Sequence, residues 1–133
     1  MREILFKAKR IDNGEWAEGY YRCIPCINRH SIMPTDPKNR WEEYPIIPET
    51  LCEYTGLNDK NGNKIFENDI LKAHLDEECP EDVSFEKVEW NGFGWTLHEA
   101  GCIDREYIDP FDLEIFEVAG NSFDNPELLK GAE

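Results

Sequence analysis

The amino-acid sequence predicts a mainly β protein, a small barrel or roll of short strands. Three observations predict this class. Apolar residues alternate with polar ones over short stretches, which is the two-residue period of a strand, and almost no stretch shows a helical period. Corners rich in Gly, Asn and Asp separate these stretches. The chain has 133 residues, about the size of one domain, so we predict a single domain over residues 1–133.

Residues 1–27 are predicted to form an N-terminal β-hairpin. In EILFKAKRI, an extended chain places Ile4, Phe6 and Ala8 on one face. The corner Asp12-Asn13-Gly14 follows, and its residues tolerate positive φ. The stretch EWAEGYYRCI then resumes with aromatic residues that favour strands.

Residues 28–48 break the pattern and are predicted to form a long irregular loop. Prolines interrupt ladder hydrogen bonding here, at Pro34, Pro37, Pro45 and Pro48. Loops of this length in compact domains are usually functional, mobile or used in assembly. The apolar side chains of this loop need a cover from this chain or from another. We therefore name as a candidate interaction surface Trp41, Tyr44, Ile46 and Ile47.

Residues 49–122 are predicted to form the barrel core. Leu51 to Leu57 form a short strand that ends at Gly56, and Asn61-Gly62 suits a tight turn with positive φ at both central residues. Further strands are expected at residues 64–66, 70–75, 85–90, 95–98 and 112–121.

Residues 123–133 are predicted to be a short helical turn and tail. Asn125 suits the N-cap, Pro126 suits the first helical position, and Gly131 suits the stop.

The charge of the chain limits its partners. The formal net charge is −15. Residues 1–40 hold 8 Lys and Arg against 5 Asp and Glu, a net of +3, whereas residues 41–133 hold 6 against 24, a net of −18. Nucleic-acid affinity comes mainly from clustered Lys and Arg, so this balance disfavours direct nucleic-acid binding. The asymmetry could instead orient two protein chains against each other, or simply keep the protein soluble.

The sequence predicts a cytoplasmic protein without a membrane partner. No window approaches the roughly 18 to 20 apolar residues that cross a bilayer. The N-terminus MREILFKAKR lacks the continuous apolar run of a signal peptide. Five cysteines, an odd number without a regular framework, fit reduced thiols.

One pattern suggests a metal. Cys23 and Cys26, followed by His30, have the spacing of a zinc knuckle. A second ligand pair is missing nearby, because the remaining cysteines are far away in sequence. Separate thiols are the preferred interpretation, and a redox pair lacks its usual βαβ setting. We predict no cofactor, since no phosphate-binding glycine motif is present.

A second pattern suggests catalysis. Asp59, Glu67 and Asp69 could act as acid and base or bind a hard cation, but they lack the alternation of a calcium loop. Asp and Asn also commonly make turns. We therefore predict that these carboxylates serve the scaffold, and we assign no catalytic residue.

Two stretches resemble the YopX family of phage and prophage proteins. PETLCEYTGLNDKNGNKIFENDI is similar to the family's T-G-L-x-D-K-N-G-x-x-I-x-E-G-D-I-V core, and VAGNSFDNPELL to its closing I-G-N-I-Y-E-N-P-E-L-L. The resemblance implies an SH3-like barrel and no established activity. Asn68 replaces the usual Gly, and left-handed geometry accepts Asn at modest cost. The matched positions, with structural roles, are Tyr54, Thr55, Gly56, Leu57, Asp59, Asn61, Gly62, Ile65, Glu67, Asp69, Ile70, Gly120, Asn121, Asn125 and Pro126.

Three function hypotheses follow. The preferred one is a non-enzymatic module that binds a host or phage protein or assembles with itself. The second is a nucleic-acid-related role, either through the basic N-terminal third or by acidic mimicry of DNA. The third is an enzyme of unknown type that uses the carboxylates near Glu67 and Asp69, which would need a strongly raised pKa.

Overall fold

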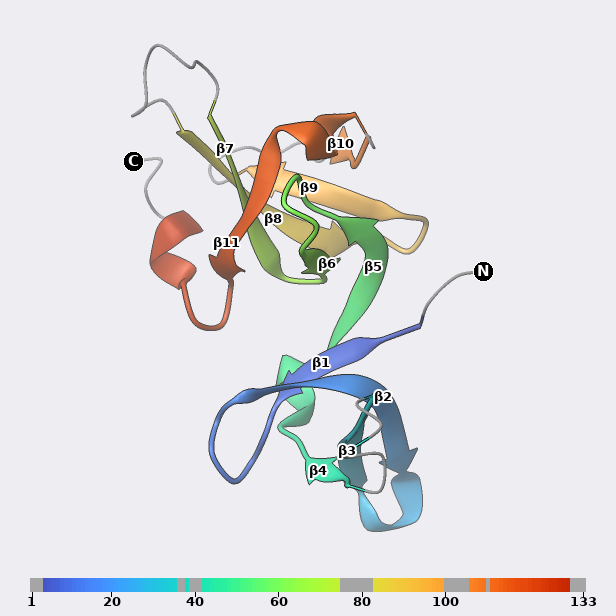
Figure 1. Cartoon of the computed structure of the whole chain (residues 1–133). Coiled ribbons are helices and arrows are strands. Elements are labelled where there is room, and N and C mark those ends of the chain that lie inside the picture. Colours follow the sequence, from blue (N-terminus) through green and yellow to red (C-terminus); the bar gives the residue numbers. More distant parts are fainter. Residues whose placement is uncertain are drawn as a thin grey trace. The chain divides into compact units, whose positions relative to one another are not determined.

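The computed structural model describes residues 4–35, 38, 42–74, 83–99, 106–109 and 111–129 (Figure 1). The chain groups into two compact units, a first unit of Met1–Tyr54 and a second unit of Thr55–Glu133. Both are built of antiparallel strands and short 3-10 helices, which confirms the mainly β prediction. The strands of the described ranges do not close into a barrel, and the SH3-like detail stays a prediction. The single domain over residues 1–133 also stays a prediction.

The first unit is an antiparallel sheet with the strand order β4-β3-β2-β1-β5. Its strands are β1 (Phe6–Lys9), β2 (Trp16–Ile24), β3 (Arg29–Pro34), β4 (Tyr44–Pro45) and the start of β5 (Cys52–Asn58). Its 3-10 helices are η1 (Pro25–Ile27) and η2 (Pro48–Thr50). β1 pairs with β2, with Phe6 opposite Gly19, which confirms the N-terminal hairpin. The core of the sheet is built from Ala8, Ala17, Ile32 and Ile46.

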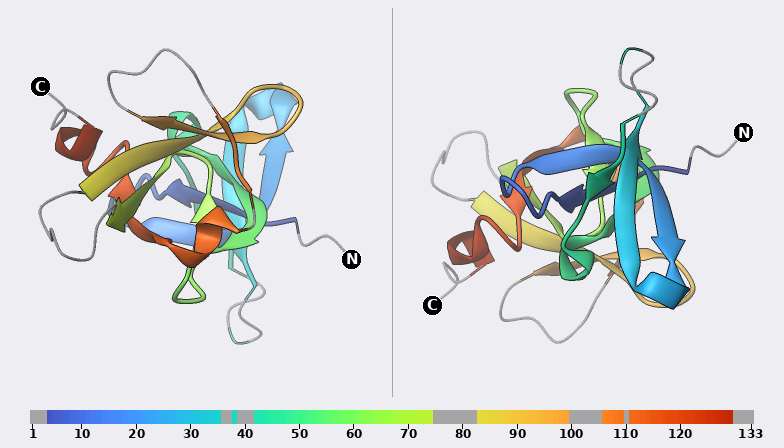
Figure 2. Two further views of the ribbon diagram at one scale, coloured as in Figure 1. Left: turned by 90° about the horizontal axis from the view of Figure 1, so that it is seen from above. Right: turned by 90° about the horizontal axis from the view of Figure 1, so that it is seen from below.

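The proline-rich segment 28–48 is not the irregular loop that we predicted. It holds β3, which pairs with β2 from Arg29 to Pro34, and the right-hand view of Figure 2 shows these two strands side by side with η1 at their turn. Pro34 comes last in β3, and Pro45 lies in β4, the edge strand. At an edge or strand end the missing N–H of proline removes no ladder hydrogen bond, so prolines there do not prevent pairing.

The second unit holds the remaining strands. They are the end of β5, β6 (Lys64–Phe66), β7 (Asp69–His74), β8 (Val83–Trp90), β9 (Trp95–Glu99), β10 (Glu106–Tyr107) and β11 (Phe116–Asn121). β5 lies beside β6, and the other five form a sheet with the order β10-β9-β8-β7-β11. The core of this unit is built from Ile65, Leu71, Ala73, Val88, Leu97 and Phe116.

The C-terminal quarter differs from the prediction in detail. Residues 112–114 form a 3-10 helix, η3 (Asp112–Glu114), and the strand that we predicted over 112–121 begins only at Phe116. The tail forms η4 (Pro126–Leu129), which confirms the short helical turn. Gly131, the predicted stop, lies outside the described residues. No helix within the described ranges is long and apolar enough to cross a membrane.

Candidate functional site

The loop between β5 and β6 is organised around the carboxylate of Asp59. This residue is only 6% exposed. Its Oδ1 accepts hydrogen bonds from the backbone N–H groups of Asn61 at 2.9 Å and Asn63 at 2.8 Å. Its Oδ2 accepts one from the backbone N–H of Val118 in β11 at 2.9 Å. The carboxylate therefore joins the loop to β11, two segments that are far apart in sequence.

The turn at Asn61-Gly62 is not the one we predicted. Only Gly62 has a positive φ, of 83°. The N–H of Gly62 donates to the carbonyl of Asp59 at 3.0 Å, and the N–H of Asp59 donates to the carbonyl of Asn63 at 2.8 Å. This pattern is typical of a three-residue hairpin loop, a type I turn followed by one left-handed residue. Asp59 favours this turn because its carboxylate accepts the N–H groups that the turn directs inward.

The electrostatics of Asp59 do not suit acid-base catalysis. Burial by itself raises the pKa of a carboxyl group, because it disfavours the charged form. The N–H groups of Val118, Asn63 and Asn61 outweigh this and hold the pKa of Asp59 below its ordinary value of 3.8. A carboxyl group that exchanges protons near neutral pH needs a raised pKa instead. At neutral pH Asp59 is therefore a charged acceptor for backbone groups.

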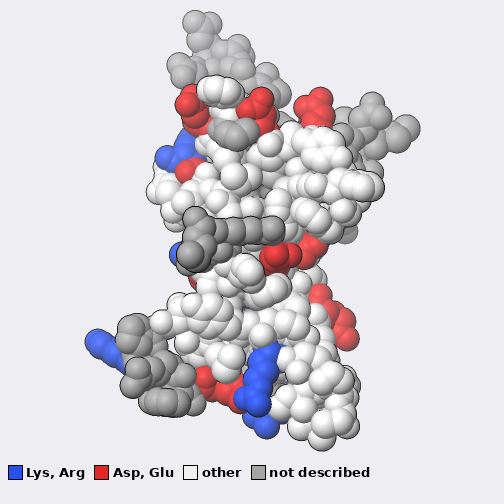
Figure 3. Space-filling view, turned by 90° about the vertical axis from the view of Figure 1, so that its right-hand side faces the viewer, with Lys and Arg blue, Asp and Glu red and all other residues white. Residues whose placement is uncertain are grey.

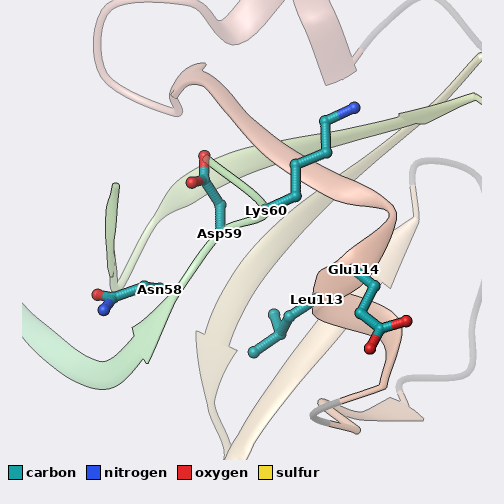
Figure 4. Close-up of a pocket in the computed structure, with 5 residues that line it drawn as sticks. All are labelled: Asn58, Asp59, Lys60, Leu113 and Glu114. Carbon is teal, nitrogen blue, oxygen red and sulfur yellow. The ribbon is translucent and has the colours of Figure 1, made fainter. Parts of the chain in front are cut away.

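A pocket of about 430 Å³ lies beside this loop (Figure 4). Its lining includes Asp59, Lys60, Leu113 and Glu114. Figure 4 shows the Asp59 carboxylate pointing away from Leu113, and the charged ends of Lys60 and Glu114 pointing in opposite directions. Leu113 packs against the core of the second unit. The charged groups thus do not converge on a point where a substrate atom could be held.

The corner before β7 uses Asp69 in a similar way. Asp69 is buried, and its Oδ2 accepts a hydrogen bond from the N–H of Phe66 at 2.8 Å. Asn68 adopts the left-handed conformation, with a φ of 69°, so it takes the place of the family's glycine as expected. Its N–H donates to the carbonyl of Val88 at 2.8 Å, and its carbonyl accepts the N–H of Ser122 at 2.9 Å. The corner connects three segments of the second unit.

The carboxylates of the motif do not form a metal site in the described residues. No group of three His, Cys, Asp or Glu side chains in those ranges could hold a metal ion. Asp59 and Asp69 each bind backbone N–H groups instead, and Glu67 between them is half-buried.

The C-terminal motif forms a second hydrogen-bonded turn. The Oδ1 of Asn121 accepts the N–H groups of Phe123 at 3.0 Å and Asp124 at 2.9 Å. Asn125 takes the predicted N-cap position before η4, where its carbonyl accepts the N–H of Leu128 at 3.1 Å, and its Oδ1 accepts the N–H of Asn121 at 3.3 Å. A Cβ atom at Gly120 would stand 2.3 Å from that same Oδ1. Only glycine fits beside the Asn125 amide, which explains the residue at position 120.

The other motif positions also lie in the scaffold. Buried side chains are contributed by Tyr54, Thr55, Ile65 and Ile70. Leu57 packs against the core of the second unit, and Pro126 begins η4. Gly56 is exposed and has a positive φ of 86°. None of these positions brings a reactive group to a pocket in the described structure.

The zinc candidates do not form a group of three metal ligands in the described structure, although Cys23 lies opposite His30 in the pairing of β2 with β3. Cys23 and Cys26 are both exposed and have free thiols. The Nδ1 of His30 lies 2.6 Å from the hydroxyl of Tyr21, and its Nε2 lies 3.2 Å from the Oδ1 of Asn28. Both ring nitrogens, the atoms that would bind zinc, are therefore occupied by hydrogen bonds.

The predicted interaction surface separates into different environments. Ile46 is buried in the core of the first unit, and it also lines a groove of that unit. Tyr44 is half-buried under the guanidinium of Arg10, which lies 4.0 Å from its ring centroid. Ile47 is exposed, and Trp41 lies outside the described residues. The burial of Ile46 was not expected, because the loop was predicted to lack the strand pairing that turns this side chain inward. The interaction surface itself stays a prediction.

A groove in the first unit was missed by sequence reasoning. It has a volume of about 530 Å³, and we call it the isoleucine groove. Its lining residues are Ile11, Ile27, Asn28, Arg29, His30, Pro45, Ile46 and Pro48, of which only Ile46 belonged to the predicted interaction surface. Ile11 and Ile27 are 63% and 62% exposed. A signal was present in the sequence, because Ile11 precedes the Asp12 corner and Ile27 follows Pro25, and turn residues rarely reach a core.

Comparisons with known proteins identify a family and solved structures of similar fold. The model of the family described as YopX protein matches residues 5–130. The crystal structure of protein EF1440 from Enterococcus faecalis has 21% sequence identity and a TM-score of 0.60, over 97% of this chain and 99% of that chain. A likeness at this identity shows the fold alone. No curated protein matches the chain.

Proposed function

The chain belongs to the YopX family, and we propose that it works by binding protein, either another copy of itself or a partner chain, without catalysing a reaction. The setting that we propose is the cytoplasm of a bacterial host that carries the phage or prophage. The backbone hydrogen bonds of Asp59 support a non-enzymatic role, because they lower its pKa and so make it unsuited to proton transfer near neutral pH.

The observation that carries the proposal is the isoleucine groove. Large apolar side chains that stand in water around a concave surface mark interaction sites. Ile11 and Ile27 are exposed and line the isoleucine groove of the first unit. The volume of the groove falls in the range of about 300–1,000 Å³ that is usual for binding pockets. Arg29 and His30 add polar groups that can fix the orientation of a bound chain.

The test combines light scattering with a pull-down from host lysate, both with the full chain. We expect the wild type either to associate with itself or to retain a partner, and Ile27→Asp to weaken that binding. Ile4→Asp is the matched control, because Ile4 is another exposed isoleucine of the first unit and does not line the groove. A wild type that stays monomeric at high concentration and retains no partner would contradict the proposal, as would equal binding by both variants.

A second candidate is acidic mimicry of DNA, which the charge of the second unit favours. Residues 55–133 hold 6 Lys and Arg against 20 Asp and Glu, a net of −14. On the face in Figure 3, acidic side chains gather over the second unit, while basic side chains are more prominent over the first. Mimicry predicts that the protein displaces DNA from a DNA-binding protein of the host and does not itself bind DNA. Direct binding would instead weaken steeply with salt.

A further inference from the structure

We infer that the isoleucine groove of one copy receives the Phe111 segment, residues 111–115, of a second copy. This inference rests on the proposed function, because it names the partner and the contact through which the chain would assemble. It joins two different surfaces, the groove in the first unit and the Phe111 segment in the second.

The lining of the groove combines exposed apolar side chains with a positively charged one. Ile11 and Ile27 stand at its edge, and Arg29 is the one charged side chain among the described residues that line it. The carboxylate of Glu43 lies 3.6 Å from Arg29 and 3.7 Å from Arg22, so two guanidinium groups share one carboxylate. These three side chains together carry a net charge of +1. The groove thus suits an apolar side chain with carboxylates beside it.

The Phe111 segment has this complementary chemistry. Phe111 is 79% exposed, and Ile115 is exposed as well. The sequence around them, Asp109 to Glu114, carries three carboxylates within three residues of Phe111. An exposed phenylalanine can bury about 150–250 Å² when it enters a pocket, which makes it a suitable anchor for an interface.

The segment is also held in place before any partner binds. The N–H of Phe111 donates to Oδ1 of Asp109 at 3.0 Å, and the N–H of Glu114 donates to the carbonyl of Phe111 at 3.3 Å. Leu113, between the exposed residues, packs into the core of the second unit. A segment that is already ordered loses less conformational entropy on binding, so its contacts contribute more to affinity.

Phe93 provides a comparison within the same unit. It is 91% exposed, more than Phe111, but its turn is uncharged, with Asn91, Gly92 and Gly94 around it. Exposure alone would favour Phe93 as the anchor. The positive charge at the groove favours Phe111, and this difference makes Phe93 a matched control.

A contact between two different surfaces has a consequence for mixtures. Each copy would present one groove and one Phe111 segment, so wild-type chains would extend into rings or chains of copies. Ile27→Asp removes the groove and keeps the segment, whereas Phe111→Ser does the reverse. A mixture of the two variants retains one productive contact per pair of chains. It should therefore form a 1:1 dimer and nothing larger.

The experiment measures mass by sedimentation for the wild type, each variant and the equimolar mixture. We expect both single variants to self-associate at least about tenfold more weakly than the wild type, the mixture to restore a dimer, and Phe93→Ser to match the wild type. If Phe111→Ser does not fold, as judged by circular dichroism, Ile115→Asp replaces it.

The possible failures are distinct. Wild-type assembly that needs Ile27 but not Phe111 would overturn this inference and leave the proposed function standing. A monomeric wild type that retains a host partner through Ile27 would do the same. The inference would also be overturned if both single variants lost assembly and their mixture formed no dimer. Monomers in every sample, wild type included, would overturn it too, because they are the result expected for a contact within one chain. A wild type without self-association or partner would overturn both proposals.

Discussion

At the scale of single residues, the polar side chains of the family motif act on the backbone. Asp59 accepts N–H groups from its own loop and from β11, and Asp69 accepts one from the residue before its corner. Asn68 supplies a left-handed backbone conformation that most residues resist. These residues fix the turns of the chain. Substitutions at them should therefore lower the stability of the fold more than they weaken the binding of a partner.

The pH dependence of stability should depend on Asp59. Its pKa is lower in the folded protein than its ordinary value of 3.8, so its stabilising effect is present above that value and is lost as pH falls through the folded pKa. Asp59→Asn should cost about 1–3 kcal/mol at pH 7, because it leaves a buried N–H group without its acceptor. Urea unfolding at pH 7 and in acid below the ordinary pKa measures this.

We expect the difference between wild type and Asp59→Asn to shrink in acid, where the wild-type carboxyl group becomes neutral. Glu49→Gln is the control, because Glu49 is exposed and its replacement should change stability little. A difference that stays equal at both pH values would count against the role assigned to the charge of Asp59.

The left-handed backbone at Asn68 gives a second prediction. Asn68→Gly should match or slightly exceed the wild type in stability, because glycine adopts a φ of 69° without steric cost. Asn68→Ala should be about 1–2 kcal/mol less stable than Asn68→Gly, since a Cβ atom disfavours this region. Thermal unfolding of the two variants compares them directly, and equal midpoints would show that the corner relaxes to another conformation.

At the scale of elements, hydrogen-bonded turns decide where strands begin and end. The turn after β11 is closed by Asn121 and Asn125, and the ladder between β7 and β11 shifts register between Val118 and Gly120. Ordinary strand propensity does not specify such a shift. Beside this shift the Asn125 amide lies close to Gly120, so that a Cβ atom at position 120 would stand 2.3 Å from its Oδ1.

Gly120→Ala should therefore destabilise the protein by about 1–3 kcal/mol, as overpacking does elsewhere. Removal of the opposing amide should relieve most of this cost, so Gly120→Ala should be less harmful in an Asn125→Ala background. A double-mutant cycle by chemical denaturation measures the coupling. Additive effects of the two substitutions would show that a clash between a Cβ atom and the Asn125 amide is not what constrains position 120.

At the scale of the whole molecule, the charge is concentrated in the second unit. Twenty carboxylates against six basic groups in residues 55–133 repel one another, and such self-repulsion destabilises a compact state. The same charge supplies the carboxylates around Phe111 that we assign to assembly. Salt should consequently have opposite effects on the two properties: it should stabilise the fold and weaken the contact between copies.

The midpoint of thermal unfolding should rise between about 0.02 and about 0.5 M NaCl, because the Debye length falls from tens of ångströms to a few. Differential scanning calorimetry at low protein concentration measures this without a contribution from assembly. KCl should give the same shift as NaCl. A large difference between the two salts would indicate specific ion binding in place of screening.

Sequence reasoning succeeded for features that depend on neighbours in the chain. The alternation around Phe6 and Ala8 predicted the first strand, and the corners at Gly14 and Gly62 predicted where the chain turns. It failed where a distant segment decides. Pairing with β2 makes a strand of Arg29–Pro34 despite its proline, and Ile46 packs into the core of the first unit although its segment was predicted to be an irregular loop.

The sequence by itself determined the mainly β character, the turn positions, the charge asymmetry and the family, because each of these follows from local composition and spacing. Only the tertiary structure decided what the polar residues bind and which apolar residues remain in water. Asp59 became a ligand for the backbone because Val118, 59 residues away, brings its N–H to within 2.9 Å. Ile27 and Phe111 remain exposed because their turns lie outside both cores.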